Sequence, residues 1–211
     1  MDTTYFGRGF GLMLFKDSYT GTNLHWDYVS HETVSLYKQG IDLLIKEGYT
    51  IRGLVCDGKR GLLNAFGQNP LQICQFHQIA IVNRYLTRNP KSLAGKQLLE
   101  LTLLLTKTDK ESFVGGLASW HKQWESFLNE RSIKVTGKKS RFTHRKLRSA
   151  YRSLTTNLPW LFTWYDNMEL KIPNTTNAID GHFSDLKNKL RNHNGMTLKR
   201  KIKFMDEFLK A

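Results

Sequence analysis

Residues 49–58 read YTIRGLVCDG, and this stretch decides the fold class. Its first eight residues form a short apolar run with β-branched side chains, which is typical of a buried strand. The run ends on Asp57-Gly58, a pair common in turns. A helical pattern precedes it over residues 32–47, where Gly48 predicts the stop, and a second apolar run, LQICQF over residues 71–76, follows it. The sequence therefore predicts an α/β fold with a buried sheet.

The segment before that helix is predicted to form an antiparallel hairpin. Residues 5–16 (YFGRGFGLMLFK) show no helical period and are expected to be extended. Residues 17–22 (DSYTGT) predict a turn, and residues 23–30 (NLHWDYVS) alternate like a second strand.

The pattern becomes helical after the second apolar run. A helix is expected from His77 to about Leu86, helical spacing dominates residues 91–165, and two more helices are predicted over 176–192 and 197–209. We therefore predict a first part of the α/β core at residues 1–88, an all-α insertion at 89–170 and closing helices of the core at 171–211. Two tryptophan pairs in the insertion, 120/124 and 160/164, predict core packing, with stacking of one indole on an unpaired base as the alternative.

The charge of the chain is strongly positive and unevenly spread. The 211 residues carry a net charge of +14, and residues 1–60 contribute none of it, with seven basic and seven acidic side chains. Two runs without acids, residues 131–156 and 187–203, hold nine and seven Lys or Arg. Solvated helix faces explain some such runs, but their interleaved aromatic and apolar residues favour a surface for a phosphate backbone.

Other classes of protein are excluded by composition. Two cysteines exclude a disulfide scaffold and indicate a reducing compartment. The longest apolar run is far shorter than the roughly 18 residues of a membrane span, and no signal peptide is visible at the start. A cytoplasmic protein with no membrane partner is expected.

Three acids stand at the ends of predicted elements. Asp2 precedes the first strand, Asp57 closes the strand YTIRGLVC, and Asp180 lies on the helix after the insertion. Carboxylates that converge from separate elements suit Mg²⁺ or Mn²⁺, and two such ions support phosphodiester chemistry. Each acid taken alone is more typical of a cap or turn than of a metal site.

Four motifs, in order along the chain, resemble the mutator-type DDE transposases of bacterial insertion sequences. They are MDTTYFGRGFGLMLFKD (1–17), GYTIRGLVCDGKRGL (48–62), CQFHQ (74–78) and NTTNAIDGHFSDLKNKLRNHNG (174–195). The resemblance implies a ribonuclease H-like core, a mixed sheet with flanking helices, in which Asp2, Asp57 and Asp180 are catalytic and hold two Mg²⁺ or Mn²⁺ ions. The third acid of that family is usually Glu, so Asp180 is one methylene short.

The same resemblance implies an activity and its partners. The activity is transposition: metal-dependent cleavage of double-stranded DNA at the element ends, then strand transfer to target DNA by a homo-oligomer associated with the bacterial nucleoid. An N-terminal DNA-binding region precedes the core in that family, so this chain is expected to be an N-terminally truncated core. A catalytically inactive DNA-binding remnant and a ribonuclease H-like nuclease acting on RNA or hybrids are the alternatives.

Cys74 and His77 match the Cys-x-x-His motif of these transposases. The resemblance places His77 near the active site, against the scissile phosphate or beside the second acid. A structural zinc site needs four ligands, and spacing gives no argument that Cys56 or His31 completes one. A buried cysteine with a hydrogen-bonded histidine is the alternative.

Two groups of basic residues are predicted to bind DNA. The first, which flanks Phe142 and Tyr151, is Arg141, Arg145, Lys146, Arg148 and Arg152. The second follows Asp180 along the same predicted helix and comprises Lys187, Lys189 and Arg191. Asp185, five residues after Asp180, is a weaker choice of third ligand because it faces another side of the helix.

Overall fold

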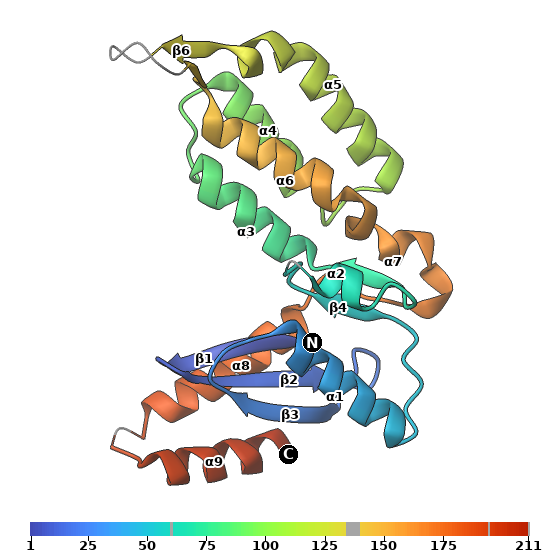
Figure 1. The fold of residues 1–211 in the computed structure, drawn as a ribbon, viewed down its shortest axis with the longest axis vertical. Coiled ribbons are helices and arrows are strands. Elements are labelled where there is room, and N and C mark those ends of the chain that lie inside the picture. The colour runs from blue at the N-terminus through green and yellow to red at the C-terminus, as the bar shows by residue number, and fades with distance from the viewer. Residues whose placement is uncertain (60, 134–139, 194, 211) are drawn as a thin grey trace.

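The computed structural model describes residues 1–59, 61–133, 140–193 and 195–210. Figure 1 shows a sheet-bearing part at one end of an elongated molecule and a helical unit at the other, with short elements between them. The first part contains β1 (Asp2–Gly7), β2 (Phe10–Lys16), β3 (Asn23–Val29), α1 (Val34–Lys46), α8 (Asn177–Arg191) and α9 (Leu198–Lys210). The mixed α/β class is confirmed.

Three strands, where two were predicted, make up the first sheet. β1, β2 and β3 pair antiparallel in that order, with Asp2 opposite Leu14 and Leu14 opposite Trp26. The prediction of one extended segment over residues 5–16 was wrong, because the chain reverses between Gly7 and Phe10. Gly9 has a φ of +71°, a left-handed conformation that glycine adopts without strain.

β2 is the central strand, and both of its faces are covered by helices. Leu12 and Leu14 pack with α8 and α9, whereas Met13 and Phe15 belong to the cluster that contains the buried face of α1. Successive side chains of a strand point to opposite faces of the sheet. The apolar residues of β2 therefore pack against α1 on one face and against α8 and α9 on the other. The sheet therefore fixes α8, which carries Asp180, relative to β1, which carries Asp2.

A second, parallel pair of strands follows along the chain. β4 (Leu54–Cys56) and β5 (Leu71–Ile73) pair in parallel, with α2 (Leu62–Ala65) between them. Only the last three residues of the predicted strand 49–56 form β structure. The Met1 nitrogen donates a hydrogen bond to the Val55 carbonyl at 3.0 Å, which places the start of β1 beside β4.

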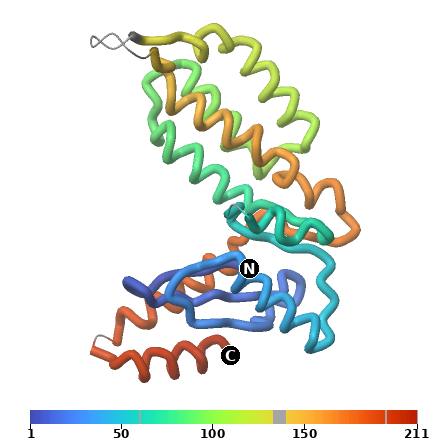
Figure 2. The backbone as a smooth tube through the Cα atoms, in the orientation of Figure 1, coloured from blue at the N-terminus to red at the C-terminus, as the bar shows by residue number. Residues whose placement is uncertain are grey.

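The helical unit is built from antiparallel helices that Figure 2 traces as a compact bundle. α3 (Gln75–Leu86) packs along α6 (Arg145–Leu161), and α4 (Leu93–Leu103) packs on α5 (Lys110–Asn129). α7 (Thr163–Asp166) and a 3₁₀ turn (Met168–Leu170) lead back toward the sheets. The insertion is not all-α as predicted: β6 (Arg131–Ile133) and β7 (Ser140–Phe142) form a hairpin, and residues 134–139 of the basic run lie outside the described residues.

Of the tryptophans of the insertion, Trp120 is buried, and Trp124 and Trp160 are partly buried against the same core. The indole nitrogens of Trp120 and Trp124 donate to the Ala94 carbonyl and to Gln97 Oε1 at 3.0 and 2.7 Å, which fastens α5 to α4. The predicted pair 160/164 is not on one helix, because α6 ends at Leu161. Core packing is confirmed for Trp120, which is buried.

Gly40 tests how closely α1 packs on the sheet, and Gly115 on α5 serves as the comparison. A Cβ on Gly40 would lie 2.3 Å from Phe15 Cζ, whereas a Cβ on Gly115 in α5 would meet no atom within 4 Å. Replacing helical glycine by alanine gains about 1 kcal/mol, and overpacking a core costs about 1–3 kcal/mol. Urea unfolding is therefore expected to show Gly115→Ala stabilised by about 1 kcal/mol and Gly40→Ala destabilised by about 1 kcal/mol. Equal stabilisation of both variants would contradict this packing.

Candidate active site

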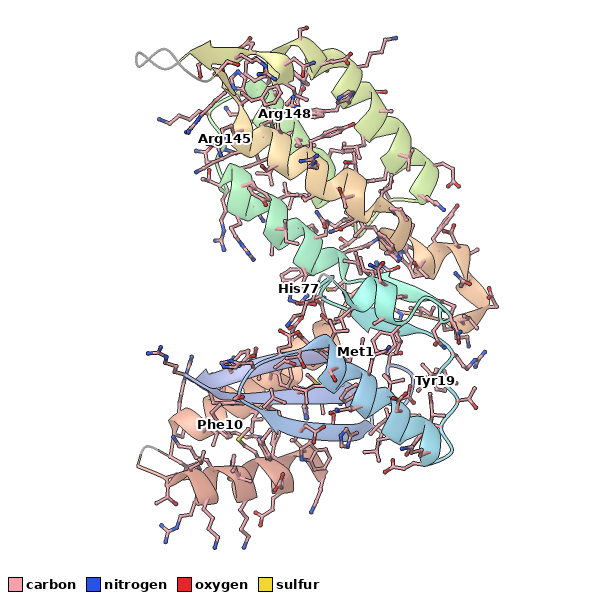
Figure 3. All side chains as sticks on the ribbon, in the orientation of Figure 1. Met1, Phe10, Tyr19, His77, Arg145 and Arg148 are labelled. Carbon is pink, nitrogen blue, oxygen red and sulfur yellow. The ribbon has the colours of Figure 1, made fainter. Side chains whose placement is uncertain are left out.

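A polar cavity of about 330 Å³ lies where the sheet-bearing part meets the helical unit. Figure 3 shows the labelled His77 at this junction, close to Met1. All three predicted catalytic acids and His77 line the cavity. Its walls are Asp2, Thr3, Thr4, Asp57, His77, Asp180, Phe183, Ser184 and Lys187.

Each of these groups comes from the end of a separate element. Asp2 is the first residue of β1, and Asp57 directly follows β4. His77 lies in the first turn of α3, and Asp180 in the first turn of α8. The N-terminal end of a helix carries partial positive charge, which makes the first turn a favourable position for acidic residues. The site therefore combines strand ends with the first turns of two helices.

Three of the side chains form a tight cluster. One donor atom each from Asp2, His77 and Asp180 lies within 4.8 Å of the other two, and among the described residues this is the one such group of metal-ligating side chains. Asp57 lines the same cavity but is not in the cluster. Its Oδ1 accepts a hydrogen bond from the Lys59 amide at 3.0 Å, which is the turn role that the sequence also allowed.

The two helix starts are tied together by hydrogen bonds. The Gln75 amide donates to the Asn174 carbonyl at 2.9 Å, and the Thr176 amide donates to Cys74 Sγ at 3.2 Å. The Thr176 hydroxyl lies 3.2 Å from Asp180 Oδ2, 3.3 Å from Cys74 Sγ and 3.5 Å from His77 Nδ1. Cys74 and Thr176 are buried. Thr176 is thus a positioning residue that the sequence reasoning missed, although it is the first residue of the predicted helix 176–192 and the residue directly before α8.

In the structure, the Cys-x-x-His motif takes part in the hydrogen bonds that join the start of α3 to the start of α8. Cys74 is fully buried and accepts hydrogen bonds, and among the described residues it joins no group of metal ligands. Burial raises the pKa of its thiol, but hydrogen bonds from His77 and Thr176 outweigh that effect and lower it. Cys56 is buried as well, and its burial raises the pKa of that thiol to about 11. The arrangement matches the alternative of a buried cysteine with a hydrogen-bonded histidine.

Burial and mutual proximity shift the pKa values of the cluster. Burial raises the pKa of Asp2 to about 6, against the opposing effects of the Thr3 amide and of His77. The hydrogen bond with Cys74 raises the pKa of His77 to about 9, with burial opposing it and with Asp2 and Asp180 adding to it. In the absence of a metal ion, the imidazolium of His77 therefore balances part of the negative charge around it.

Basic residues predicted on the helix after Asp180 lie in different settings. Lys187 lines the cavity, and its Nζ lies 5.7 Å from the centre of the Phe6 ring. Lys189 pairs with Asp185 at 3.0 Å on the exposed surface of α8, and Arg191 is exposed at the helix end. Asp185 takes no part in the Asp2–His77–Asp180 cluster.

The other predicted DNA-binding group lies far from the acids. Figure 3 shows Arg145 and Arg148 at the end of the helical unit remote from His77. Arg141 is exposed on β7 rather than helical, and Arg145, Lys146 and Arg152 are exposed on α6. The basic charge is therefore divided between two regions of the molecule.

Comparisons with known protein families, curated proteins and solved structures give no match for this chain. The resemblance to mutator-type transposases thus stays a prediction from the motifs. In the described part of the chain, no helix combines the length and the apolar character needed to cross a bilayer.

Asp2 is expected to destabilise the protein when no metal is bound. Its pKa is raised from 3.8 to about 6, so its contribution to stability is present below pH 3.8 and is lost as the pH rises through 6. Asn at this position keeps the oxygen that accepts the Thr3 amide at 2.8 Å and removes the charge. In EDTA, Asp2→Asn should raise the free energy of unfolding by about 1–3 kcal/mol at pH 8.

Urea unfolding of both proteins at pH 8 and pH 4 measures this effect. The two should have nearly equal stability at pH 4, where Asp2 is largely protonated in the folded state. A variant less stable than the native protein at pH 8 would contradict a buried, destabilising carboxylate.

Proposed function

We propose that this chain is the catalytic core of a DNA transposase that uses divalent metal ions to cleave DNA strands and transfer them to a target. The observation that carries the proposal is the convergence of Asp2, His77 and Asp180 from three separate elements into one cavity, which Asp57 and Lys187 also line. These are residues of the four motifs that resemble mutator-type transposases, so the geometry and the motifs point to one site.

The arrangement of strands supports a ribonuclease H-like core as part of this proposal. An antiparallel set of three strands and a parallel pair meet where the Met1 nitrogen donates to the Val55 carbonyl, so the start of β1 lies beside β4. Helices cover both faces of the antiparallel set. Asp2 on β1 and Asp57 directly after β4 therefore line the same cavity.

The residues present fit a divalent cation. Two carboxylates supply the oxygen ligands that Mg²⁺ and Mn²⁺ prefer, and the imidazole of His77 adds a nitrogen ligand that Mn²⁺ accepts more readily than Mg²⁺. We assign Asp2, Asp180 and His77 to one ion, with Asp57 as the carboxylate available for a second. When bound, such ions stabilise the charge that develops on the attacking and leaving oxygens of a phosphodiester.

Other groups in and beside the cavity have supporting roles in this proposal. Lys187 supplies a positive charge within the cavity, which draws the phosphate toward the acids. Thr176 holds Asp180 and His77 in place through its hydroxyl, which lies 3.2 and 3.5 Å from them. Ser184 lines the cavity and donates its hydroxyl proton to the Asp180 carbonyl at 2.9 Å, one turn along α8.

The nicking of a supercoiled plasmid tests the proposal. With Mg²⁺ or Mn²⁺ present, the native chain should nick the plasmid, and Asp57→Asn should abolish nicking because it removes a carboxylate from the cavity. Asp185→Asn is the matched control: it lies on the same helix as Asp180, is exposed, and should nick as the native chain does.

Each other outcome has a definite meaning. Unchanged nicking by Asp57→Asn would refute the assignment of that acid. DNA binding by the native chain without cleavage in either metal would favour the inactive DNA-binding remnant. Cleavage of RNA or hybrids in preference to DNA would favour the nuclease alternative.

A further inference from the structure

A second hollow lies in the helical unit, away from the acids. It is a groove of about 600 Å³ between α5 and α6, with Phe142 of β7 among its lining residues. Arg145, Arg148 and Arg152 of α6 line it from one side, and His121 and Glu125 of α5 from the other. A volume of this size accommodates a small ligand or a short stretch of one strand, whereas a double helix is too wide to enter it.

The three arginines form a row along one face of α6. Their spacing of three and four residues places them on neighbouring turns, so the row spans about 10 Å along the helix axis at 1.5 Å per residue. At about 3.4 Å per nucleotide, the axial rise of a stacked strand in a duplex, that length matches about three stacked nucleotides, and fewer nucleotides of a more extended strand. Among the described residues, the ion pairs of the protein include none of the three, so their charges are available to phosphates.

One member of the row is already held in place. Arg148 donates to the Leu128 carbonyl and to Asn129 Oδ1, each at 2.9 Å, and its guanidinium lies 3.7 Å from the centre of the Phe142 ring. A guanidinium fixed by such contacts loses little conformational freedom when an anion binds. Arg145 and Arg152, on either side of it, are exposed and complete the row.

The groove also offers aromatic surface for bases. The His121 ring stacks on the Tyr151 ring with centroids 4.7 Å apart and planes at 13°, and Tyr151 rests in turn on the buried Trp120. Stacking on such rings binds a base of any sequence. Glu125 is the one carboxylate among the lining residues, and it can accept hydrogen bonds from the amino groups of bases. Three arginines against one glutamate leave the groove positively charged.

We propose that the groove between α5 and α6 binds an unpaired DNA strand of two to three nucleotides, with its phosphates on Arg145, Arg148 and Arg152 and a base against His121. The choice of DNA rests on the proposed function, whereas the preference for a single strand rests on the groove alone. Because the groove lies at the far end of the helical unit, it holds DNA that is distant from the cleaved bond.

Binding in EDTA tests the groove without any cleavage. Fluorescence anisotropy compares a ten-nucleotide single strand with the duplex of the same sequence. Arg145→Ala/Arg152→Ala should weaken binding of the single strand at least tenfold and binding of the duplex less than threefold. The dependence of single-strand affinity on salt should also fall, by about 0.7 in logarithmic slope for each phosphate that the variant no longer neutralises.

A matched control removes two charges elsewhere on the helical unit. Lys96 and Lys122 are exposed and do not line the groove, so Lys96→Ala/Lys122→Ala should change single-strand affinity less than threefold. Equal weakening by the two double variants, or a loss for the duplex as large as for the single strand, would overturn the proposal.

The contribution of the base is measured separately. His121→Ala should weaken single-strand binding several-fold, and His121→Phe should restore it because it keeps an aromatic face. Inorganic polyphosphate should compete poorly at equal charge, and equal competition would reduce the groove to an anion site and refute the proposal. Groove binding that persists in a chain without nicking activity would leave this inference standing while the proposed function failed.

Discussion

The candidate active site depends on one buried contact between segments about a hundred residues apart. Cys74 accepts the Thr176 amide, and next to it the Gln75 amide donates to the Asn174 carbonyl. The segments on either side of this contact are the first turns of α3 and α8, which carry His77 and Asp180. The Thr176 hydroxyl lies 3.5 Å from His77 Nδ1 and 3.2 Å from Asp180 Oδ2, so one side chain contacts both of these residues.

The third member of the cluster, Asp2, lies on the sheet, and burial of its carboxylate costs folding free energy. β2 is buried on both faces, which fixes β1 beside it and α8 beneath it, so Asp2 is held against Asp180. A carboxyl group buried there resists ionisation, and the burial that raises its pKa works against folding at neutral pH. Unfavourable burial of a charged group is common where a site must bind a cation, since binding of the cation offsets that cost.

Helical periodicity and turn residues in the sequence predicted those features of the structure that depend on residues close together in the chain. The helix at residues 34–46, its end at Gly48 and the acids at element ends follow from periodicity and turn chemistry, and α8 and α9 were predicted within a residue or two. The reversal between Gly7 and Phe10 was missed, although Arg8-Gly9 is a two-residue connection with glycine of the kind that joins hairpin strands. The hairpin of Arg131–Ile133 and Ser140–Phe142 was missed because its basic residues resemble a solvated helix. The roles of Thr176 and His121 depend on contacts with distant residues, which periodicity does not encode.

We propose that Asp2, His77 and Asp180 together hold a divalent metal ion. Electron paramagnetic resonance of Mn²⁺ bound to the chain tests it most directly, because the hyperfine coupling of a ligating nitrogen identifies the imidazole. One bound Mn²⁺ with a nitrogen coupling that disappears in His77→Gln, and no tight binding in Asp180→Asn, is the predicted result. Mn²⁺ that binds with no nitrogen coupling, or equally well to Asp180→Asn, would contradict it.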